Sequence, residues 1–330
     1  MTDPGDSLIA GIDLGGTKIA AVLASPEGIL ARRRQPVPLE GAPEDIANAM
    51  RSLLEQCCED AGVRWSDIDA IGLSACGPFG QDRAGRLTLL APNLCGGLSA
   101  ERSVPNRWPV VALEADCEVW QKPVRIVNDA AAALMAEHRF GLLAGVQDAA
   151  YLTWSTGIGV ALMSEGRVLR GKRGNAGHAG HTIPVRVDAA GRRCGCGNVE
   201  DIEGLAGGAS LARVWGDSTA SLFAAAQAGD VRAGRLIDTA LDAVSAALYN
   251  LVVTLDLERV VIGGGLFWAH RETLLPGLRD RVFRHPARSG LSVLFEGVQI
   301  DAVTDPERTA DLGALCIVMP ADWPASRFNH

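Results

Sequence analysis

The sequence has no surplus of basic residues, because 31 Lys and Arg stand against 39 Asp and Glu, for a formal net charge of -8. Nucleic-acid binders usually carry a basic surface, so we expect no nucleic-acid partner. No uninterrupted apolar run approaches the roughly 20 residues that a membrane helix needs, which argues against a membrane partner. The N-terminal residues 1–7 are acidic and too short for a secretory signal. These absences predict a soluble, cytoplasmic protein.

A disulfide framework is also missing. The cysteines lie between Cys57 and Cys316 in no pattern that suggests bridges, which favours a reducing compartment. With 330 residues, 48% of them hydrophobic, the chain has enough apolar material for two domains or for one large α/β domain.

The beginning and the middle of the chain share a pattern of strands joined by glycine turns. Residues 8–13, 18–24 and 29–37 are predicted strands, and a helix follows from about residue 43 to residue 62. Residues 151–169 repeat the order strand, turn, strand, turn, strand. Chance similarity of two glycine-rich hairpins is one interpretation. We favour the other, which is a pair of related α/β domains facing each other.

The second half of the chain is rich in helical patterns. Residues 129–140 favour a helix by propensity, and apolar residues at helical spacing predict a long helix over about 233–255. A closing helix is expected over about 309–319.

The two best-known nucleotide motifs are absent: no G-x-G-x-x-G opens a helix, and no G-x-x-x-x-G-K-[ST] occurs. Instead, glycine clusters follow apolar strands at 13–17 (DLGGT), 155–159 (STGIG) and 261–266 (VIGGGL). Glycines let backbone N–H groups approach an anion, and Asp13 could hold a magnesium ion through water. Each cluster alone could be an ordinary turn. Together they indicate a nucleotide held between two domains.

Asn128 and Asp129 follow a predicted strand and begin a predicted helix. The helix dipole and the first-turn N–H groups favour a carboxylate there in its ionised form, as a general base requires. The alternative is a capping pair without chemistry.

Potential metal ligands gather between residues 178 and 203. His181, Cys194 and Cys196 are plausible zinc ligands, with Asp201 as a possible fourth. The alternative is a pair of free thiols beside a hydrogen-bonded histidine.

Taken together, these motifs resemble the ROK family of sugar kinases and sugar-responsive repressors, within the fold class of hexokinase and actin. The resemblance rests on DLGGT, APNL at 91–94, VND at 127–129, STGIG, the glycine pattern from Gly174 to His181, CGCG at 194–197, and VIGGGL.

The resemblance implies a fold of two related α/β domains of the actin-like ATPase (ribonuclease H-like) type, with a cleft between them. We expect a smaller N-terminal domain of residues 1–124 plus about 309–330. The larger domain would span 125–308 and carry a zinc-type loop at 178–203. The family commonly forms homodimers.

The activity implied by the resemblance is transfer of the γ-phosphoryl group of ATP, with Mg²⁺, to a hydroxyl of a hexose such as glucose, normally the 6-hydroxyl. Asp129 would be the catalytic base. The other expected sugar contacts are Asn93, Asn128, His181 and Glu203, with His178 in addition. The expected ATP-binding residues are Asp13, Gly15, Gly16, Thr17, Lys18, Ser155, Thr156, Gly157, Gly159, Gly263, Gly264 and Gly265.

Two positions depart from the family pattern. His178 stands where the family usually has a glutamate that binds sugar hydroxyls, and an imidazole can donate where a carboxylate only accepts. Glu200 and Asp201 replace the usual Gly and Cys after CGCG. Zinc accepts carboxylate oxygen, so we expect a structural Zn²⁺ bound by His181, Cys194, Cys196 and Asp201.

Several alternatives stay open at this point. His178 could redirect the pocket to an unusual sugar or a cyclitol, or mark a sugar-sensing protein without catalysis. A sugar-responsive repressor is disfavoured, since the first glycine turn begins at Asp13 and leaves no room for a DNA-binding domain before it. Polyphosphate is an alternative donor, although the glycine clusters favour ATP.

Overall fold

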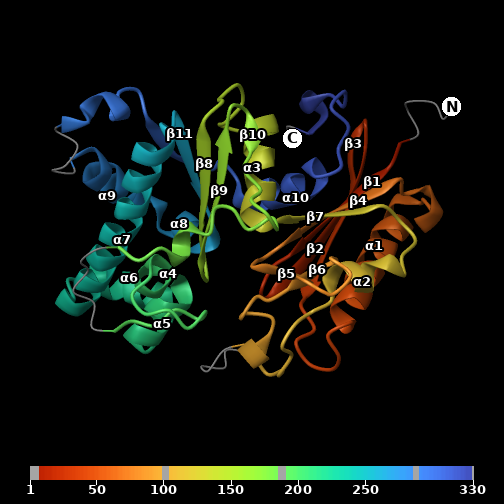
Figure 1. The fold of residues 1–330 in the computed structure, drawn as a ribbon, viewed down its shortest axis with the longest axis horizontal. Helices are drawn as coiled ribbons and strands as arrows, with labels where there is room; N and C mark the ends of the chain where they lie inside the picture. Colours follow the sequence, from red (N-terminus) through yellow and green to blue (C-terminus); the bar gives the residue numbers. More distant parts are fainter. Residues whose placement is uncertain (1–6, 99–103, 185–190, 285–289, 329–330) are drawn as a thin grey trace. The chain divides into compact units, whose positions relative to one another are not determined.

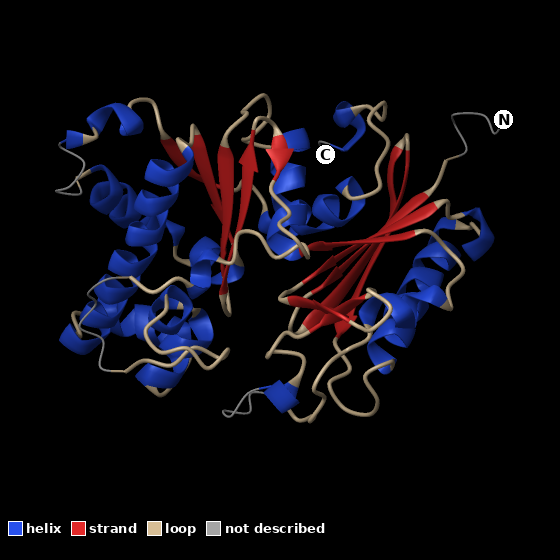
Figure 2. Ribbon diagram, viewed as in Figure 1, coloured by secondary structure: helices blue, strands red, loops and turns tan. Residues whose placement is uncertain are grey.

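The computed structural model describes residues 7–98, 104–184, 191–284 and 290–328. They form two compact units, each built around one sheet (Figures 1 and 2). Unit 1 comprises Met1–Ala144, Arg170–Ala176 and Glu307–His330, and unit 2 comprises Gly145–Leu169 and Gly177–Pro306.

Unit 1 contains a five-stranded sheet in the order β3-β2-β1-β4-β7. Its strands are β1 (Ile9–Leu14), β2 (Lys18–Ser25), β3 (Gly28–Pro36), β4 (Ala70–Ala75) and β7 (Val124–Asn128). The first three run antiparallel to one another, whereas β4 and β7 continue the sheet parallel to β1. A small two-stranded sheet joins β5 (Phe79–Gln81) to β6 (Leu87–Leu89).

The unit boundary lies farther along the chain than the sequence predicted. We expected the second domain to begin at residue 125, but β7 pairs with β4, so it completes the first sheet. The helix that follows, α3 (Asp129–Phe140), also belongs to unit 1, which extends to Ala144.

Helices cover both faces of this sheet. One face packs on α1 (Asp45–Ala61) through a core that includes Ile12 and Leu54, and α2 (Leu113–Glu118) joins the same core. The other face packs on α3 and on α10 (Pro306–Cys316) through a smaller cluster that includes Val22 and Leu315.

Two glycines allow α10 to lie directly on the strands. A Cβ at Gly11 of β1 would lie 2.9 Å from the backbone N of Leu315, and a Cβ at Gly72 of β4 would lie 3.0 Å from Cβ of Ile317. Interiors have no room for such atoms, so glycine is required where the backbones approach this closely. The approach fixes α10 beside the ends of β1 and β4.

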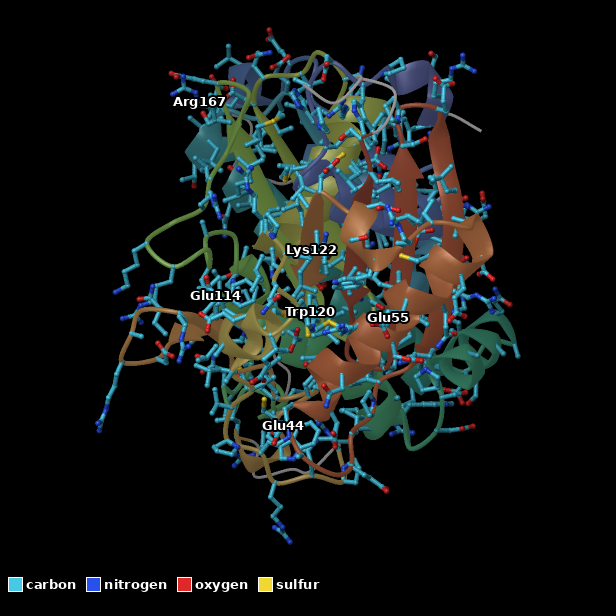
Figure 3. All side chains as sticks on the ribbon, turned by 90° about the vertical axis from the view of Figure 1, so that its right-hand side faces the viewer. Glu44, Glu55, Glu114, Trp120, Lys122 and Arg167 are labelled. Carbon is cyan, nitrogen blue, oxygen red and sulfur yellow. The ribbon has the colours of Figure 1, made fainter. Side chains whose placement is uncertain are left out.

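Two residues just before β7, Trp120 and Lys122, contact the segment 65–68 that precedes β4; both are labelled in Figure 3. Lys122 donates hydrogen bonds to the carbonyls of Ser66 and Ile68 at 2.8 and 2.6 Å. Trp120 meets the Trp65 ring edge to face, with centroids 6.3 Å apart. These contacts anchor the strand that ends at Asn128.

Unit 2 repeats the topology with the sheet order β10-β9-β8-β11-β12. Its strands are β8 (Ala149–Trp154), β9 (Ile158–Ser164), β10 (Arg167–Val168), β11 (Arg259–Gly263) and β12 (Gln299–Ala302). As in unit 1, the first strand pairs antiparallel with the second and parallel with the fourth. The shared order and directions confirm the prediction of two related α/β domains.

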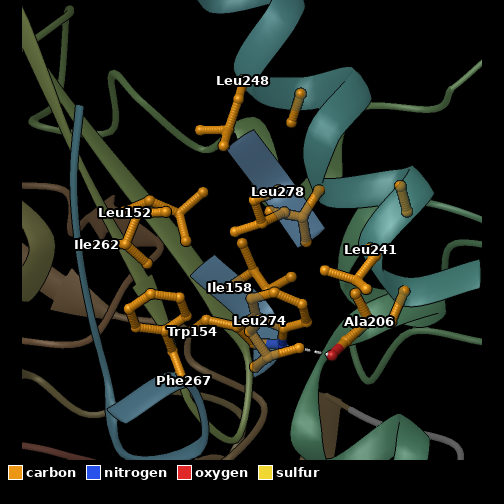
Figure 4. Packing of buried hydrophobic residues seen from close by; sticks show 14 of the residues in the cluster. Leu152, Trp154, Ile158, Ala206, Leu241, Leu248, Ile262, Phe267, Leu274 and Leu278 are labelled. Atoms are coloured by element: carbon orange, nitrogen blue, oxygen red, sulfur yellow. Dashed lines mark hydrogen bonds between the residues drawn. The ribbon is translucent and has the colours of Figure 1, made fainter. Parts of the chain in front are cut away.

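The helices of unit 2 pack mainly on one face of its sheet. They are α4 (Ile202–Ala206), α5 (Gly208–Trp215), α6 (Thr219–Gln227), α7 (Val231–Leu255), α8 (Gly265–Ala269) and α9 (Arg271–Phe283). In their core, Trp154 packs on Phe267 with centroids 6.5 Å apart and donates a hydrogen bond to the carbonyl of Ala206 at 2.7 Å (Figure 4). This core joins the end of β8 to α4 and α8.

Helix α7 is long and apolar enough to cross a membrane by length and composition, but 56% of that window is buried inside the protein. It packs against α4, α6 and α9. We therefore assign it to the core of unit 2.

Candidate active site

The carboxylate of Asp13 lies at the end of β1, beside the neighbouring strand β4. It accepts a hydrogen bond of 2.8 Å from the hydroxyl of Ser74, its register partner on β4. Burial raises the pKa of Asp13 above its ordinary value, and the Ser74 hydrogen bond opposes that rise. A cation placed here would favour the ionised form.

Asp129 lies at the first position of α3, directly after β7. Burial raises its pKa to about 7, and the negative charge of Asp13 adds to the rise. Its carboxylate accepts a 2.8 Å hydrogen bond from the N–H of Ala130, which Asn128 also caps at 3.1 Å. A carboxylate that titrates near neutral pH suits a general base. From the sequence we expected the helix N-terminus to favour the ionised form, whereas burial and the Asp13 charge shift the Asp129 pKa in the opposite direction.

Asn93 contacts both Cys76 and the DLGGT turn. Burial, together with the charges of Asp129 and Asp13, raises the pKa of the Cys76 thiol well above its ordinary value, so the thiol keeps its proton. It donates to Oδ1 of Asn93 at 3.9 Å. The Asn93 amide packs against Gly16, where a Cβ would lie 3.0 Å from Cγ of Asn93.

The DLGGT turn is closed by a hydrogen bond of 3.0 Å from the N–H of Gly15 to the carbonyl of Lys18. Thr17 is exposed. The Lys18 ammonium, which we predicted to contact ATP, lies 3.7 Å from the carboxylate of Glu307, and both groups are more than half exposed. Pairs of this kind are weak, so Lys18 can exchange its partner for a phosphate.

The STGIG turn of unit 2 is held against α4 and α5. The carbonyls of Ser155 and Thr156 accept hydrogen bonds of 2.9 Å from the N–H groups of Gly208 and Ala209. The N–H of Ile158 donates to Oε2 of Glu203 at 2.8 Å.

The third glycine cluster ends β11 and begins α8. Gly264 has a φ of 94° and caps α8. A side chain there would collide with the backbone of Trp154. Both the positive φ and the lack of space therefore require glycine at this position. Gly263 ends the strand and Gly265 opens the helix, which places all three residues at the strand end as predicted.

His178 and His181 flank a single 3₁₀ turn, η4 (Ala179–His181). Their rings are 6.0 Å apart between centroids, and both side chains are partly exposed. Residues 185–190 of the predicted loop 178–203 lie outside the described residues.

The four predicted metal ligands meet in unit 2. The ligand atoms of His181, Cys194, Cys196 and Asp201 all lie within 4.8 Å of one another. From Nδ1 of His181, the distances are 3.1 Å to Asp201 Oδ2, 3.7 Å to Cys194 Sγ and 3.6 Å to Cys196 Sγ. Tetrahedral zinc with its usual bond lengths needs ligand atoms about 3.3 to 3.8 Å apart, so the cluster fits a metal.

Each unit therefore collects a separate set of the predicted residues. Unit 1 brings together Asp13, the DLGGT turn, Asn93, Asn128 and Asp129. Unit 2 brings together the STGIG turn, Glu203 and the metal-ligand cluster, and it also carries the VIGGGL turn and His178.

The sequence analysis missed residues that surround these groups. Ser74 could have been found, because it occupies the strand parallel to Asp13. A charged network at the edge of the same sheet gave no local signal: Arg34 pairs with Glu307 at 2.6 Å and with Asp311 at 3.4 Å, and Arg32 lies 3.4 Å from Asp311.

Comparisons with known proteins agree on one family. A family model described as "ROK family" matches residues 9–295. The N-acetylmannosamine kinase of Citrobacter koseri is 33% identical over 282 residues, covering 84% of this chain and 89% of the relative.

Solved structures give the same result. The ROK hexokinase of Thermus thermophilus is 33% identical with a TM-score of 0.72, covering 94% of this chain and 97% of its own. A ROK family glucokinase from Streptomyces griseus, solved with glucose and AMPPNP, is 27% identical with a TM-score of 0.67, covering 93% and 98%.

The raised pKa of Asp129 predicts a pH-dependent effect on stability. A carboxyl whose pKa is higher in the folded protein stabilises the fold when protonated, and that contribution is lost as the pH rises toward about 7. Asp129→Asn should therefore gain stability over the wild type as the pH is raised from roughly 4 to 8, by up to about 4 kcal/mol. Urea unfolding at several pH values measures the difference.

Asp67→Asn provides a control of opposite sign, because Arg64 lowers the pKa of Asp67. Relative to the wild type, this variant should lose stability as the pH rises through the acidic range to about 4 to 5, and the difference should stay constant above that range. A stability difference for Asp129→Asn that does not change with pH would refute the raised pKa.

Proposed function

Since this chain belongs to the ROK family and is a sugar kinase of that family, we propose that it transfers the γ-phosphoryl group of ATP to the 6-hydroxyl of a hexose. The observation that carries this proposal is the partly buried Asp129, whose pKa of about 7 suits a base for a sugar hydroxyl. The glycine turns at the strand ends support a phosphate-bearing donor.

Asp129 would accept the hydroxyl proton as the oxygen attacks the γ-phosphorus. Phosphoryl transfer proceeds through a loose transition state, so positioning and charge neutralisation supply most of the catalysis. Asn128 would orient the sugar while its side chain caps α3. The negative charge of Asp13 contributes to the raised pKa of Asp129. A magnesium ion that neutralises this charge would therefore lower the pKa of Asp129.

The donor would be ATP bound as its magnesium complex. The N–H groups of the DLGGT and STGIG turns would contact its phosphates, and the VIGGGL turn would lie against the nucleoside. Asp13 would hold the magnesium ion through water. Ser74 donates to one of its carboxylate oxygens at 2.8 Å, so the other oxygen would accept from that water.

We propose N-acetylmannosamine as the acceptor. The relative from Citrobacter koseri is an N-acetylmannosamine kinase at 33% identity. His178 offers a chemical reason, because an imidazole N–H can donate to the carbonyl oxygen of an acetamido group, whereas a glutamate carboxylate could not. Asn93 and Glu203 would bind the hydroxyls.

Glucose is the second candidate. It is favoured by the likeness to the Thermus thermophilus hexokinase and to the glucokinase structure that holds glucose. His178 would then accept a hydrogen bond from a hydroxyl through its unprotonated nitrogen.

The metal of the ligand cluster would be a structural Zn²⁺ bound by His181, Cys194, Cys196 and Asp201. A bound zinc would fix the histidine segment relative to α4, which begins after Asp201 and carries Glu203. A homodimer and a cytoplasmic location are the remaining parts of the proposal, and both come from the resemblance to the family.

The acceptor is tested by ADP release with Mg-ATP over a panel of hexoses, N-acetylhexosamines and cyclitols. N-acetylmannosamine should give the highest kcat/KM. Asp129→Asn should lower kcat by about 10² to 10⁴-fold, the usual contribution of a positioned base. Asp116→Asn, a partly buried carboxylate on α2, is the matched control and should keep wild-type turnover.

His178→Glu should lower the ratio of kcat/KM for N-acetylmannosamine over glucose by about tenfold or more, because the acetamido carbonyl loses its donor. If glucose leads in the wild type, the second candidate replaces the first. Near-normal turnover in Asp129→Asn would rule out its role as the base.

The metal assignment is tested by elemental analysis of purified protein and by competition with a chromophoric chelator. One zinc per chain is expected. Asp201→Asn keeps an oxygen for the 2.7 Å capping bond from the N–H of Gly204 but loses the charge, so zinc affinity should fall by about tenfold or more. Asp201→Cys should raise it. Equal affinity in all three proteins would exclude Asp201 as a ligand.

A further inference from the structure

In unit 1, Asn93 packs directly on the turn proposed to bind phosphate. The turn at Ala91 fixes its backbone, since the N–H groups of Leu94 and Cys95 donate to the Ala91 carbonyl at 3.0 and 2.7 Å. A Cβ at Gly16 would lie 3.3 Å from Cβ of Asn93 and nearer still to its Nδ2. Because even the first side-chain carbon is this close, a rotation of the amide alone could not make room.

In unit 2, Glu203 holds the same relation to the STGIG turn. A Cβ at Gly157 would lie 3.0 Å from Cδ of Glu203, and closer to Oε2. That oxygen accepts the N–H of Ile158 at 2.8 Å, while Oε1 accepts the thiol of Cys194 at 3.1 Å. The carboxylate is therefore part of the hydrogen bonding that shapes the turn.

We propose that Asn93 and Glu203 are positioning residues for the two phosphate turns, in addition to the sugar contacts assigned to them, an inference that rests on the proposed function. Each lies against one glycine of the turn in its own unit, Gly16 for Asn93 and Gly157 for Glu203. A sugar hydroxyl that binds the Asn93 amide or the Glu203 carboxylate changes how these side chains contact Gly16 and Gly157. Acceptor binding thus sets the conformation of the donor-binding turns.

Such coupling is reciprocal. If the sugar changes the affinity for the nucleotide by some factor, the nucleotide changes the affinity for the sugar by the same factor. The requirement for glycine at residues 16 and 157 then has a physical cause besides phosphate access: a larger residue displaces the sugar contact.

Hydrogen exchange without any ligand tests the positioning role. Glu203→Ala removes the acceptor of the Ile158 N–H, so exchange there should rise about fivefold or more, while peptides covering residues 13–18 stay unchanged. Asn93→Ala should raise exchange in residues 13–18 and leave residues 155–159 unchanged. Each unit thereby serves as the control for the other. Unchanged exchange in both turns would overturn the proposal.

Sugar binding without nucleotide tests the link to the acceptor in unit 1. Gly16→Ala should weaken the affinity for the sugar about 10- to 100-fold, the usual cost of displacing a contact group by about 1 Å. Gly234→Ala on α7 is the control: nothing lies within 4 Å of a Cβ at this position, so the sugar affinity should hold. Gly16→Ala in an Asn93→Ala background should cost less than in the wild type, because the amide it would displace is gone and only the Cβ of residue 93 remains nearby.

The corresponding variant in unit 2 is Gly157→Ala, and Gly234→Ala is again the control. Only Gly157→Ala should weaken sugar binding, because only its Cβ would meet the Glu203 carboxylate. Equal effects of the test and control variants in both units would contradict the coupling.

The two hypotheses fail in different ways. If the exchange results hold but no sugar is phosphorylated, the positioning role stands and the kinase assignment fails. If sugar is phosphorylated but the glycine variants and their controls behave alike, the kinase stands and the positioning role fails.

Discussion

The Asp13 and Asp129 carboxylates share one densely packed part of unit 1, and the account of catalysis depends on their electrostatic interaction. Burial and the Asp13 charge hold the pKa of Asp129 near 7. The sheet brings the two groups together, because β4 pairs with β1 at Asp13 and Ser74, and with β7 at Ala75 and Asn128.

Unit 2 uses the same sheet topology for a different purpose. Its first strand also ends in a glycine turn, but α4 and α5 brace that turn through Glu203 and two backbone hydrogen bonds. Glu203 also accepts the Cys194 thiol, so the metal-ligand cluster, Glu203 and the STGIG turn belong to one hydrogen-bonded assembly. The duplicated sheets thus carry the Asp13 and Asp129 carboxylates in unit 1 and the metal-ligand cluster beside the STGIG turn in unit 2.

Much of this arrangement could be predicted from the sequence. The glycine turns, the Asn128 cap and the metal-ligand cluster have local spacing that fixes their geometry, and strand alternation revealed the duplication. The boundary near residue 125 was misplaced because strand pairing, here β7 with β4, leaves no local pattern. Asp311 escaped notice for the same reason, since it is nearly 300 residues from Asp13 in the sequence. Helix α7 is a different case. Its length and composition would suit a membrane span, and only its packing in the core of unit 2 distinguishes it from one.

The pH dependence of kcat/KM for the acceptor sugar, at saturating Mg-ATP, tests the central claim most directly. The carboxylate form of Asp129 would be the base, so kcat/KM should be constant at high pH and fall about tenfold per pH unit below a midpoint at or below about 7. A lower midpoint than about 7 would mean that magnesium or substrate neutralises the Asp13 charge before the proton is lost. A profile that stays flat down to about pH 5 would contradict the account, because no group with a raised pKa would then control the reaction.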